Sequence, residues 1–249
     1  MAAITVACAM EQKADSYWIN DVNSSLIGVI ESAINNPEGL YEGYKAIWDA
    51  QYSFEEGHIA HYYRIRDEYN DGDTSAAVTL YLLARCVKGA VRYSADGKFN
   101  QSPDKRRHGT KPERVLKSAI ALNKLLYGRV KLTSYDYADM LDEIEPGDFV
   151  YMDPPYQGVS NTRDHRYFAG VELDSLVLFL EGLNCRNVPF VLSYDGSLGD
   201  KTYGKDLPDK LNCKKMLLDA GLSAQSTLLG KPEKTFEGLY LSKALYSEE

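Results

Sequence analysis

The second half of the chain alternates between short apolar runs and segments with apolar residues at helical spacing. Runs rich in β-branched and aromatic residues predict strands at residues 129–137, 148–153 and 188–196. Segments with apolar residues on one helical face predict helices at residues 138–147, 173–184 and 207–221. Gly221 is expected to end the last helix, and residues 222–245 predict a terminal hairpin. Because strands alternate with helices, we expect an α/β fold with a mostly parallel sheet.

The first half of the chain predicts one strand and several helices. The segment SYWIND, residues 16–21, has the pattern of a short strand that ends in an acid. An amphipathic helix is expected to follow at residues 24–34, with Asn36 and Pro37 ending it. Further helices are predicted at residues 37–68, 74–91 and 113–127.

Composition is typical of one globular domain. A chain of 249 residues that is 44% hydrophobic is long enough for a large α/β domain with an insertion. We find neither a signal peptide nor an apolar segment long enough to cross a bilayer, so we expect no membrane association and a cytoplasmic location. The cysteines have neither disulfide-framework nor metal-ligand spacing, which predicts reduced thiols and no metal site: Cys8, Cys86, Cys185 and Cys213.

Charge is distributed unevenly along the chain. The net charge of −8 argues against unspecific wrapping of a polyanion by the whole surface. One short stretch is basic, with only Asp104 and Glu113 opposing it: Lys98, Lys105, Arg106, Arg107, Lys111, Arg114 and Lys117. Such a run is most often a solvated face. In an acidic chain, however, a local basic patch is where the phosphates of a nucleic acid would bind.

The stretch GDFVYMDPPYQG, residues 147–158, ends a predicted strand with an acid, two prolines and an aromatic residue. Asp153 is the first residue past the strand, where the ligands of parallel sheets bind. Pro154 and Pro155 lack N–H groups and have a fixed φ, so carbonyl acceptors are held there without a local donor. Tyr156 adds a flat apolar face. The combination fits a planar group that carries an amine, and the alternative is a turn stiffened by prolines.

The sequence DPPY resembles the motif IV signature of DNA methyltransferases that act on amino groups. The rest of the chain resembles the Dam-like, D12-type N6-adenine-specific family in these blocks: YWINDVNSSLI, RYSADGKFNQSPDKRR, DFVYMDPPYQG, RYFAGV, VPFVLSYDG, YGKDLP and EGLYLS. The resemblance implies a Rossmann-like fold that uses S-adenosylmethionine. It also implies a catalytic domain at residues 1–50 and 128–249, with a mainly helical DNA-recognition insertion at residues 51–127.

The resemblance implies a chemistry for the DPPY segment, Asp153, Pro154, Pro155 and Tyr156. An adenine is flipped out of double-stranded DNA into a pocket, at a cost of a few kcal/mol. Tyr156 stacks on the flipped base. Asp153 and the carbonyl of Pro154 accept hydrogen bonds from the amine, which directs the nitrogen lone pair toward the methyl group of S-adenosylmethionine.

The resemblance also implies which residues contact S-adenosylmethionine: Asn20, Asp21, Asp136, Tyr137 and Asp153. Asp21 takes the ribose hydroxyls, although an acid at this position also commonly starts a turn or caps a helix. Asp136, with Tyr137, contacts the adenine of the cofactor, although Asp136 alone would more often cap a turn. Asp195 ends another predicted strand, and a turn before Gly196 is as good an explanation as a role in the site.

Contacts with DNA are expected from the segment RY–GKFN and the basic residues that follow it. The candidates for base-edge, stacking or phosphate contacts are Arg92, Tyr93, Lys98, Phe99, Asn100, Lys105, Arg106 and Arg107.

The chain departs from the family pattern at its beginning. It contains neither the proline- and glycine-containing segment called motif X nor the Phe-x-Gly-x-Gly turn of motif I, and residues 3–12 align with the helix that follows motif I. The missing strand belongs in the middle of the sheet, between the strands that end at Asp21 and Asp153. Its absence is expected to leave two long apolar strand edges without partners and half of the cofactor pocket open.

Two interpretations account for this departure. In a split enzyme, a small partner polypeptide supplies motifs X and I and pairs into the sheet. Alternatively, the chain is a non-catalytic DNA-binding or scaffold subunit of a DNA modification or defence complex. The intact DPPY, Asp21 and Asp136 favour the split enzyme, for which an adjacent reading frame of about 50 residues is expected. A third class, methylation of an amine in RNA, protein or cytosine, fits the adenine-family blocks less well.

Overall fold

The computed structural model describes residues 2–155, 172–198, 201–202, 206–222 and 234–246. The chain forms two compact units, Met1–Asp136 and Tyr137–Glu249. This division lies at neither end of the predicted insertion, whose limits stay a prediction. An α/β fold is confirmed, because each unit combines helices with a sheet.

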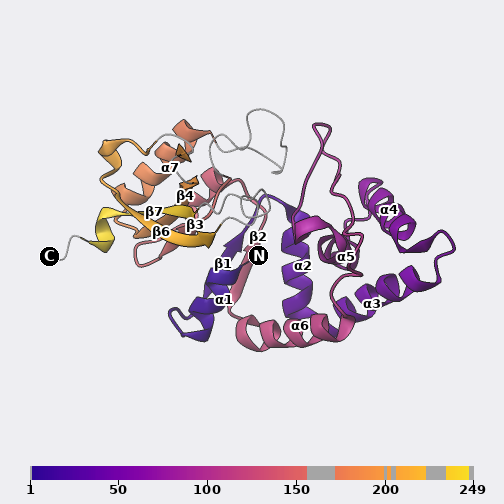
Figure 1. Cartoon of the computed structure of the whole chain (residues 1–249). Helices are drawn as coiled ribbons and strands as arrows, with labels where there is room; N and C mark the ends of the chain where they lie inside the picture. Colours follow the sequence, from indigo (N-terminus) through magenta and orange to yellow (C-terminus); the bar gives the residue numbers. More distant parts are fainter. Residues whose placement is uncertain (1, 156–171, 199–200, 203–205, 223–233, 247–249) are drawn as a thin grey trace. The chain divides into compact units, whose positions relative to one another are not determined.

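The first unit is built around a two-stranded parallel sheet. Its strands β1 (Tyr17–Asn20) and β2 (Val130–Thr133) pair with Ile19 opposite Leu132, and Figure 1 shows them side by side. The helices α1 (Ala3–Met10), α2 (Ser24–Asn35) and α6 (Pro112–Leu126) belong to the same unit. Their apolar faces form one core with β1: Ala9, Ile19, Ile27, Ile30, Ile34 and Leu126. As expected, α2 ends just before Pro37: its last residue is Asn35, and Asn36 is its C-cap.

Between α2 and α6 the chain adds three helices. They are α3 (Pro37–Ser53), α4 (Gly57–Asn70) and α5 (Ala76–Arg85), followed by a 3₁₀ turn, η1 (Val87–Gly89). The helical structure predicted at residues 37–68 is confirmed except for a break after Ser53. Gly57, where α4 begins, has a φ of 87°, which favours glycine. The helix predicted at residues 74–91 ends early, at Arg85. The core of this region is rich in aromatic residues: Tyr44, Tyr62, Tyr69, Tyr81, Tyr93 and Phe99.

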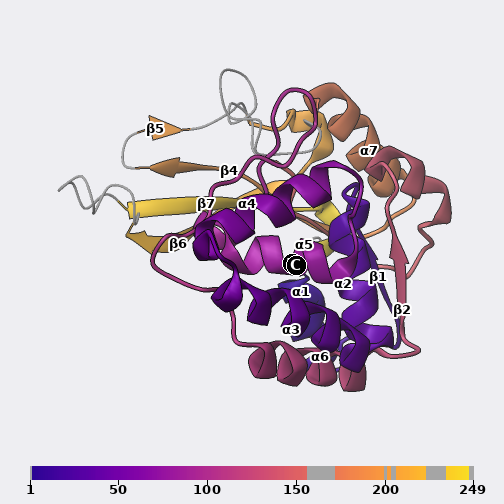
Figure 2. The same ribbon diagram turned by 90° about the vertical axis from the view of Figure 1, so that its right-hand side faces the viewer.

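The second unit contains a mixed sheet with the order β3-β4-β7-β6, and β5 pairs with β4. Figure 2 shows β5, β4, β7 and β6 in succession. The elements are η2 (Tyr137–Glu143), β3 (Val150–Met152), α7 (Leu173–Cys185), β4 (Phe190–Leu198), β5 (Lys201–Thr202), η3 (Asp209–Leu211), β6 (Lys214–Leu222), β7 (Lys234–Leu241) and η4 (Lys243–Leu245). Only the β3–β4 pair is parallel in this unit.

The helix predicted at residues 207–221 is wrong. The segment forms the short η3 and then β6, which pairs antiparallel with β7, for instance Lys215 with Tyr240. A hairpin-like pairing is present near the end of the chain, as predicted. It begins at Lys214 rather than at residue 222.

Strands β1 and β3 lie at the edges of their sheets. Among the described residues, β1 pairs with β2 alone, and β3 pairs with β4 alone. These are the strands that end before Asp21 and Asp153, where open edges were expected. The edges are short rather than long, because β1 has 4 residues and β3 has 3.

The four cysteines are free, and each unit has two of them. Cys185 is exposed, Cys8 and Cys213 are half-buried, and Cys86 is buried. In the part of the chain that the structure describes, no helix has the length and apolar character needed to span a bilayer.

Candidate functional site

Asp21 follows β1 directly and starts the turn into α2. Its backbone N–H reaches the carbonyl of Thr133 at 3.3 Å, which continues the parallel pairing by one residue. One carboxylate oxygen accepts the N–H of Asn23 at 2.8 Å, and the side chain is exposed. The surrounding protein displaces water from the carboxylate and raises the pKa of Asp21, while the Asn23 hydrogen bond lowers it. Within the described part of this turn, the second carboxylate oxygen accepts no hydrogen bond.

Asn20 connects the end of β1 to the segment after β2. Its amide oxygen accepts the N–H of Tyr135 at 2.9 Å and the hydroxyl of Thr133 at 2.8 Å. Its amide nitrogen donates to the carbonyl of Tyr135 at 3.0 Å. Because both ends of the amide are occupied, Asn20 holds the Tyr135 backbone in place, one residue before Asp136. This positioning role was not part of the sequence prediction.

Along the chain, Asp136 is the last residue of the first unit and Tyr137 the first residue of the second. Asp136 is exposed, three residues after β2. The ring of Tyr137 meets the ring of Phe179 on α7 edge-on, with centroids 5.5 Å apart and an interplanar angle of 90°. This contact belongs to the second unit and fixes the beginning of η2 against α7.

Asp153 follows β3, at the carboxyl end of the parallel pair of the second unit. Val150, Tyr151 and Met152 lie opposite Phe190, Val191 and Leu192 of β4. The carboxylate of Asp153 is exposed. Its pKa is nevertheless raised, first by the displacement of water by surrounding protein and then by the negative charge of Glu237. Pro154 and Pro155 follow, both half-buried.

Glu237 is a residue that sequence reasoning missed. It lies on β7, opposite Gly196 of β4, and its charge acts on Asp153. The signal was present, because Glu237 begins the block EGLYLS that carries part of the family resemblance. No strand-end position or motif marked it as part of a site.

The side chains of two further candidates, Tyr156 and Asp195, lie outside the described part of the structure. Tyr156 lies outside the described residues. Asp195 belongs to β4, which continues to Leu198, so the turn considered as its alternative is absent. The pairing of β4 with β7 shifts between Ser193 and Gly196, which puts Asp195 in a bulge, and its side chain is outside the described part.

The segment RY–GKFN forms a small antiparallel hairpin. Tyr93 and Phe99 face each other across it, and the N–H of Asn100 donates to the carbonyl of Arg92 at 2.8 Å. Since side chains alternate along paired strands, Arg92, Lys98 and Asn100 are exposed, whereas Tyr93 and Phe99 are 5% and 2% exposed. The structure therefore does not support base contacts by Tyr93 and Phe99, which instead pack the hairpin onto the core.

The hydroxyl of Tyr93 ties the hairpin to the turn that carries Asp21. It accepts a hydrogen bond from the side-chain amide of Asn23 at 2.7 Å and lies 3.2 Å from the hydroxyl of Tyr69. Tyr69 in turn donates to the hydroxyl of Ser25 at 3.0 Å. Asn23 also caps α2 by accepting the N–H of Ser25. The hairpin and the Asp21 turn are thus held by one network of buried polar groups.

The remaining basic candidates are at the surface. Lys105, Arg106 and Arg107 are all exposed, in a loop that follows the hairpin. The guanidinium of Arg107 pairs with Asp104 at 2.7 Å. Within the described ranges, the side chains of Lys105 and Arg106 form no ion pair with a carboxylate. These two cations are therefore available to a phosphate.

The structure groups the predicted residues into two sets. Within the first unit, the Asp21 turn, Asn20 and the exposed hairpin belong to one packed assembly. Within the second unit, Asp153 follows β3 and is influenced by Glu237. Each set follows the carboxyl end of a parallel strand, which is the position that such folds use for ligands.

Comparison with known proteins adds an independent finding. Residues 3–216 match the family model of the D12 class N6 adenine-specific DNA methyltransferases. The chain is also 26% identical over 157 residues to a DNA N-6-adenine-methyltransferase of Escherichia phage P1, an alignment that covers 61% of this chain and 20% of the phage protein.

Two other relatives align over most of this chain. The Type II methyltransferase M.MjaIII of Methanocaldococcus jannaschii is 26% identical over 236 residues, which are 89% of this chain and 77% of the relative. The Retron Ec67 DNA adenine methylase of Escherichia coli is 24% identical over 230 residues, 89% of this chain and 78% of the relative. The chain thus spans a fifth of the phage protein and about three quarters of the other two.

Proposed function

Because the chain belongs to the D12 class N6 adenine-specific DNA methyltransferase family, we propose that it transfers a methyl group from S-adenosylmethionine to the exocyclic amine of an adenine in double-stranded DNA. The observation that carries the proposal is the position of Asp153, Pro154 and Pro155 directly after β3. There the parallel pairing with β4 holds a carboxylate and a proline-stiffened backbone at the ligand-binding end of the sheet.

Asp153 acts on the amine of the target base. Its carboxylate and the carbonyl of Pro154 accept the two N–H bonds, which fixes the nitrogen and directs its lone pair away from the ring. The nitrogen bonds to the methyl carbon as the carbon–sulfur bond breaks, and the surplus proton leaves to Asp153 and then to water. The pKa of Asp153 is raised, which makes the carboxylate a better proton acceptor than an ordinary aspartate.

Asp21 suits the ribose of S-adenosylmethionine. Its exposed carboxylate keeps acceptor capacity after binding Asn23, and two hydroxyl donors match that capacity. Asp136 and Tyr137 are assigned to the adenine side, and Asn20 holds the backbone before them. When bound, S-adenosylmethionine supplies a methyl group on a sulfonium, a leaving group that needs no strong base. Correct placement of the amine then provides most of the acceleration.

DNA is contacted by the exposed basic residues of the first unit. Lys98, Lys105 and Arg106 bind phosphates, while Arg92 and Asn100 reach base edges or the backbone beside them. Arg107 contributes less charge because Asp104 pairs with it. The target adenine leaves the stack to reach Asp153, and Tyr156 stacks on the flipped base. These assignments are supported by exposure, charge and family membership.

We further propose that the active enzyme contains a strand that this chain does not supply. The printed sequence has no Phe-x-Gly-x-Gly turn, and the described β1 and β3 each have one edge without a partner. A small polypeptide with motifs X and I is the partner that fits, because its strand would pair with both edges and its glycine turn would complete the cofactor pocket. The size of such an obligate interface is about 2,000 Å² or more.

Reconstitution tests both parts of the proposal. The chain is produced alone and together with a candidate polypeptide that contains Phe-x-Gly-x-Gly, and transfer of a tritiated methyl group to duplex DNA is measured. Transfer that requires both polypeptides supports the split enzyme. Transfer by the chain alone contradicts the need for a partner, and DNA binding without transfer in any combination supports the non-catalytic subunit instead.

A further inference from the structure

Arg85 is the largest fully buried side chain described in the structure, with 0% of its surface exposed. It lies in the last turn of α5. A buried guanidinium is costly unless its donors are satisfied. The two terminal nitrogens of Arg85 bind backbone carbonyls: the oxygen of Asp104 at 2.9 Å, that of Arg107, and that of His58 at 3.5 Å. Its buried Nε–H has no hydrogen-bond partner among the described residues. Among the described residues no carboxylate pairs with it, and the hydrogen bonds that it donates go to backbone carbonyls.

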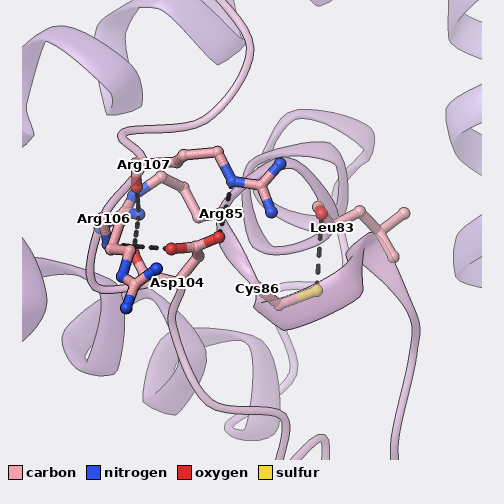
Figure 3. A network of polar contacts seen from close by, with 6 residues as sticks. All are labelled: Leu83, Arg85, Cys86, Asp104, Arg106 and Arg107. Carbon is pink, nitrogen blue, oxygen red and sulfur yellow. Dashed lines mark hydrogen bonds and ion pairs between the residues drawn. The ribbon is translucent and has the colours of Figure 1, made fainter. Parts of the chain in front are cut away.

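The acceptors at Asp104 and Arg107 are the two ends of a short loop. We call residues 104–107 the basic loop. Hydrogen bonds within the loop also hold its shape. The carboxylate of Asp104 accepts the N–H of Arg106 at 2.9 Å and the Nε–H of Arg107 at 2.7 Å. The N–H of Asp104 also donates to the carbonyl of Arg85 at 2.8 Å. Figure 3 shows Arg85 and Asp104 together within this network.

Gly109 packs against the stem of Arg85. It has a φ of +87°, and a Cβ at this position would lie 3.0 Å from Cδ and 3.2 Å from Cγ of Arg85. The backbone that leaves the basic loop therefore lies directly on the aliphatic part of the buried arginine. A side chain at residue 109 would push the two apart.

We propose that Arg85 is a positioning residue that holds the basic loop in the shape in which Lys105 and Arg106 meet DNA phosphates. This inference rests on the proposed DNA-binding function. Three neighbouring cations repel one another, and a free loop would lose conformational entropy on binding. Because the guanidinium of Arg85 binds both ends of the loop, the loop is already ordered in the free protein and loses less conformational entropy when DNA binds. Nη1 of Arg85 binds both loop carbonyls while Nη2 reaches the carbonyl of His58. Lysine would not replace it, because an ammonium has one nitrogen and lacks the second one that the guanidinium holds in a fixed plane.

The shape of the loop is tested first, without DNA. Trypsin cleavage after Lys105, Arg106 and Arg107 is timed by mass spectrometry for the full chain and for Arg85→Lys. We expect cleavage in the loop to become about fivefold faster or more, since local opening becomes easier. Cleavage after Lys98 in the hairpin and the melting temperature report whether the rest of the unit stays folded. The control is Arg186→Lys, because Arg186 also binds backbone carbonyls, those of Leu141 and Ile144, but in the second unit.

A second variant keeps the test decisive if Arg85→Lys unfolds. Gly109→Ala disturbs the contact with Arg85 from outside the core, and Gly128→Ala is its control: Gly128 has a similar φ of +72° with no atom within 4 Å of a built Cβ. Faster loop cleavage in Gly109→Ala but not in Gly128→Ala supports the proposal. Equal cleavage in the two variants overturns it.

DNA affinity is then measured by fluorescence anisotropy on the same proteins. We expect Arg85→Lys or Gly109→Ala to weaken duplex binding about fivefold, because the loop must be ordered on binding. A loop that opens without any loss of affinity overturns the positioning role. The variant Arg106→Ala/Arg107→Ala tests the DNA contact separately from the positioning role of Arg85. If this variant binds DNA with unchanged affinity, the proposed DNA contact of the loop is wrong. The cleavage experiment then still decides whether Arg85 holds the loop.

Discussion

At the scale of single residues, the carboxylate of Asp153 carries the proposed chemistry. Asp153→Ala is expected to reduce methyl transfer by the reconstituted enzyme by about 10³-fold or more, since it removes an acceptor that directs the reacting amine. Affinity for duplex DNA should stay within about twofold, because the carboxylate acts after DNA is bound. Single-turnover transfer and anisotropy measure the two effects. Asp209→Ala, an exposed carboxylate of η3, is the control, and normal turnover in Asp153→Ala would exclude the assignment.

Glu237 predicts a pH effect. Its negative charge raises the pKa of Asp153, and the ionised form of Asp153 is the one that accepts hydrogen bonds from the amine. Activity should therefore fall as the pH drops through this raised pKa. Glu237→Gln removes the repulsion and lowers the pKa, so the acidic limb of the kcat/KM profile moves to lower pH. A limb that does not move would mean that another group controls it.

Sequence reasoning located Asp21 and Asp153 because each is the acid that directly follows a short apolar run. This pattern depends only on neighbouring residues, so it can be recognised without knowing which strands pair. It did not reveal the burial of Tyr93 and Phe99. The sequence RYSADGKFN shows which residues alternate, but the side that faces the core depends on Tyr69 and Asn70 of α4, which are distant in sequence. Glu237 was missed for a similar reason, because its effect on Asp153 arises only through the pairing of β7 with β4.

At the scale of elements, the basic loop predicts the salt dependence of DNA binding. Arg106→Ala/Arg107→Ala should weaken binding and lower the slope of log affinity against log salt by roughly one to two, since about 0.9 counterion is released per phosphate contact. The control Lys210→Ala/Lys243→Ala removes the same charge from the second unit. Titrations at several salt concentrations measure the slope. Equal slopes in the wild type and the loop variant would identify the loop as a solvated face.

The error at β6 shows why elements are harder to predict than strand ends. The sequence KKMLLDAGL consists largely of residues with good helix propensity, and it lacks the strict alternation of a half-buried strand. Pairing with β7 outweighs that propensity, and Met216, Leu217 and Leu218 remain 42%, 58% and 44% exposed. The break between α3 and α4 was missed because SFEEGH continues an acceptable helical pattern, with a single glycine as its only signal.

At the scale of the whole molecule, the open edges of β1 and β3 predict weak cofactor binding by the chain alone. A glycine turn after a central strand lets the backbone approach the methionine part of S-adenosylmethionine closely, and the printed sequence contains no Phe-x-Gly-x-Gly. Isothermal titration of the purified chain should give no binding at micromolar concentrations, and addition of the complementing polypeptide should restore it. Micromolar binding without a partner would contradict the split enzyme.

The cysteines differ in exposure, which allows natural residues of the two units to be labelled selectively. Cys185 is exposed on the second unit and Cys8 is half-buried on the first, while Cys86 is buried. Burial also raises the pKa of Cys213 to about 11 and that of Cys86 above its usual value, so both hold few reactive thiolates near neutral pH. Maleimide dyes should therefore label Cys185 first and Cys8 second. Energy transfer between the two dyes would then report, without any engineered site, whether the distance between the two units changes when the proposed partner polypeptide is added.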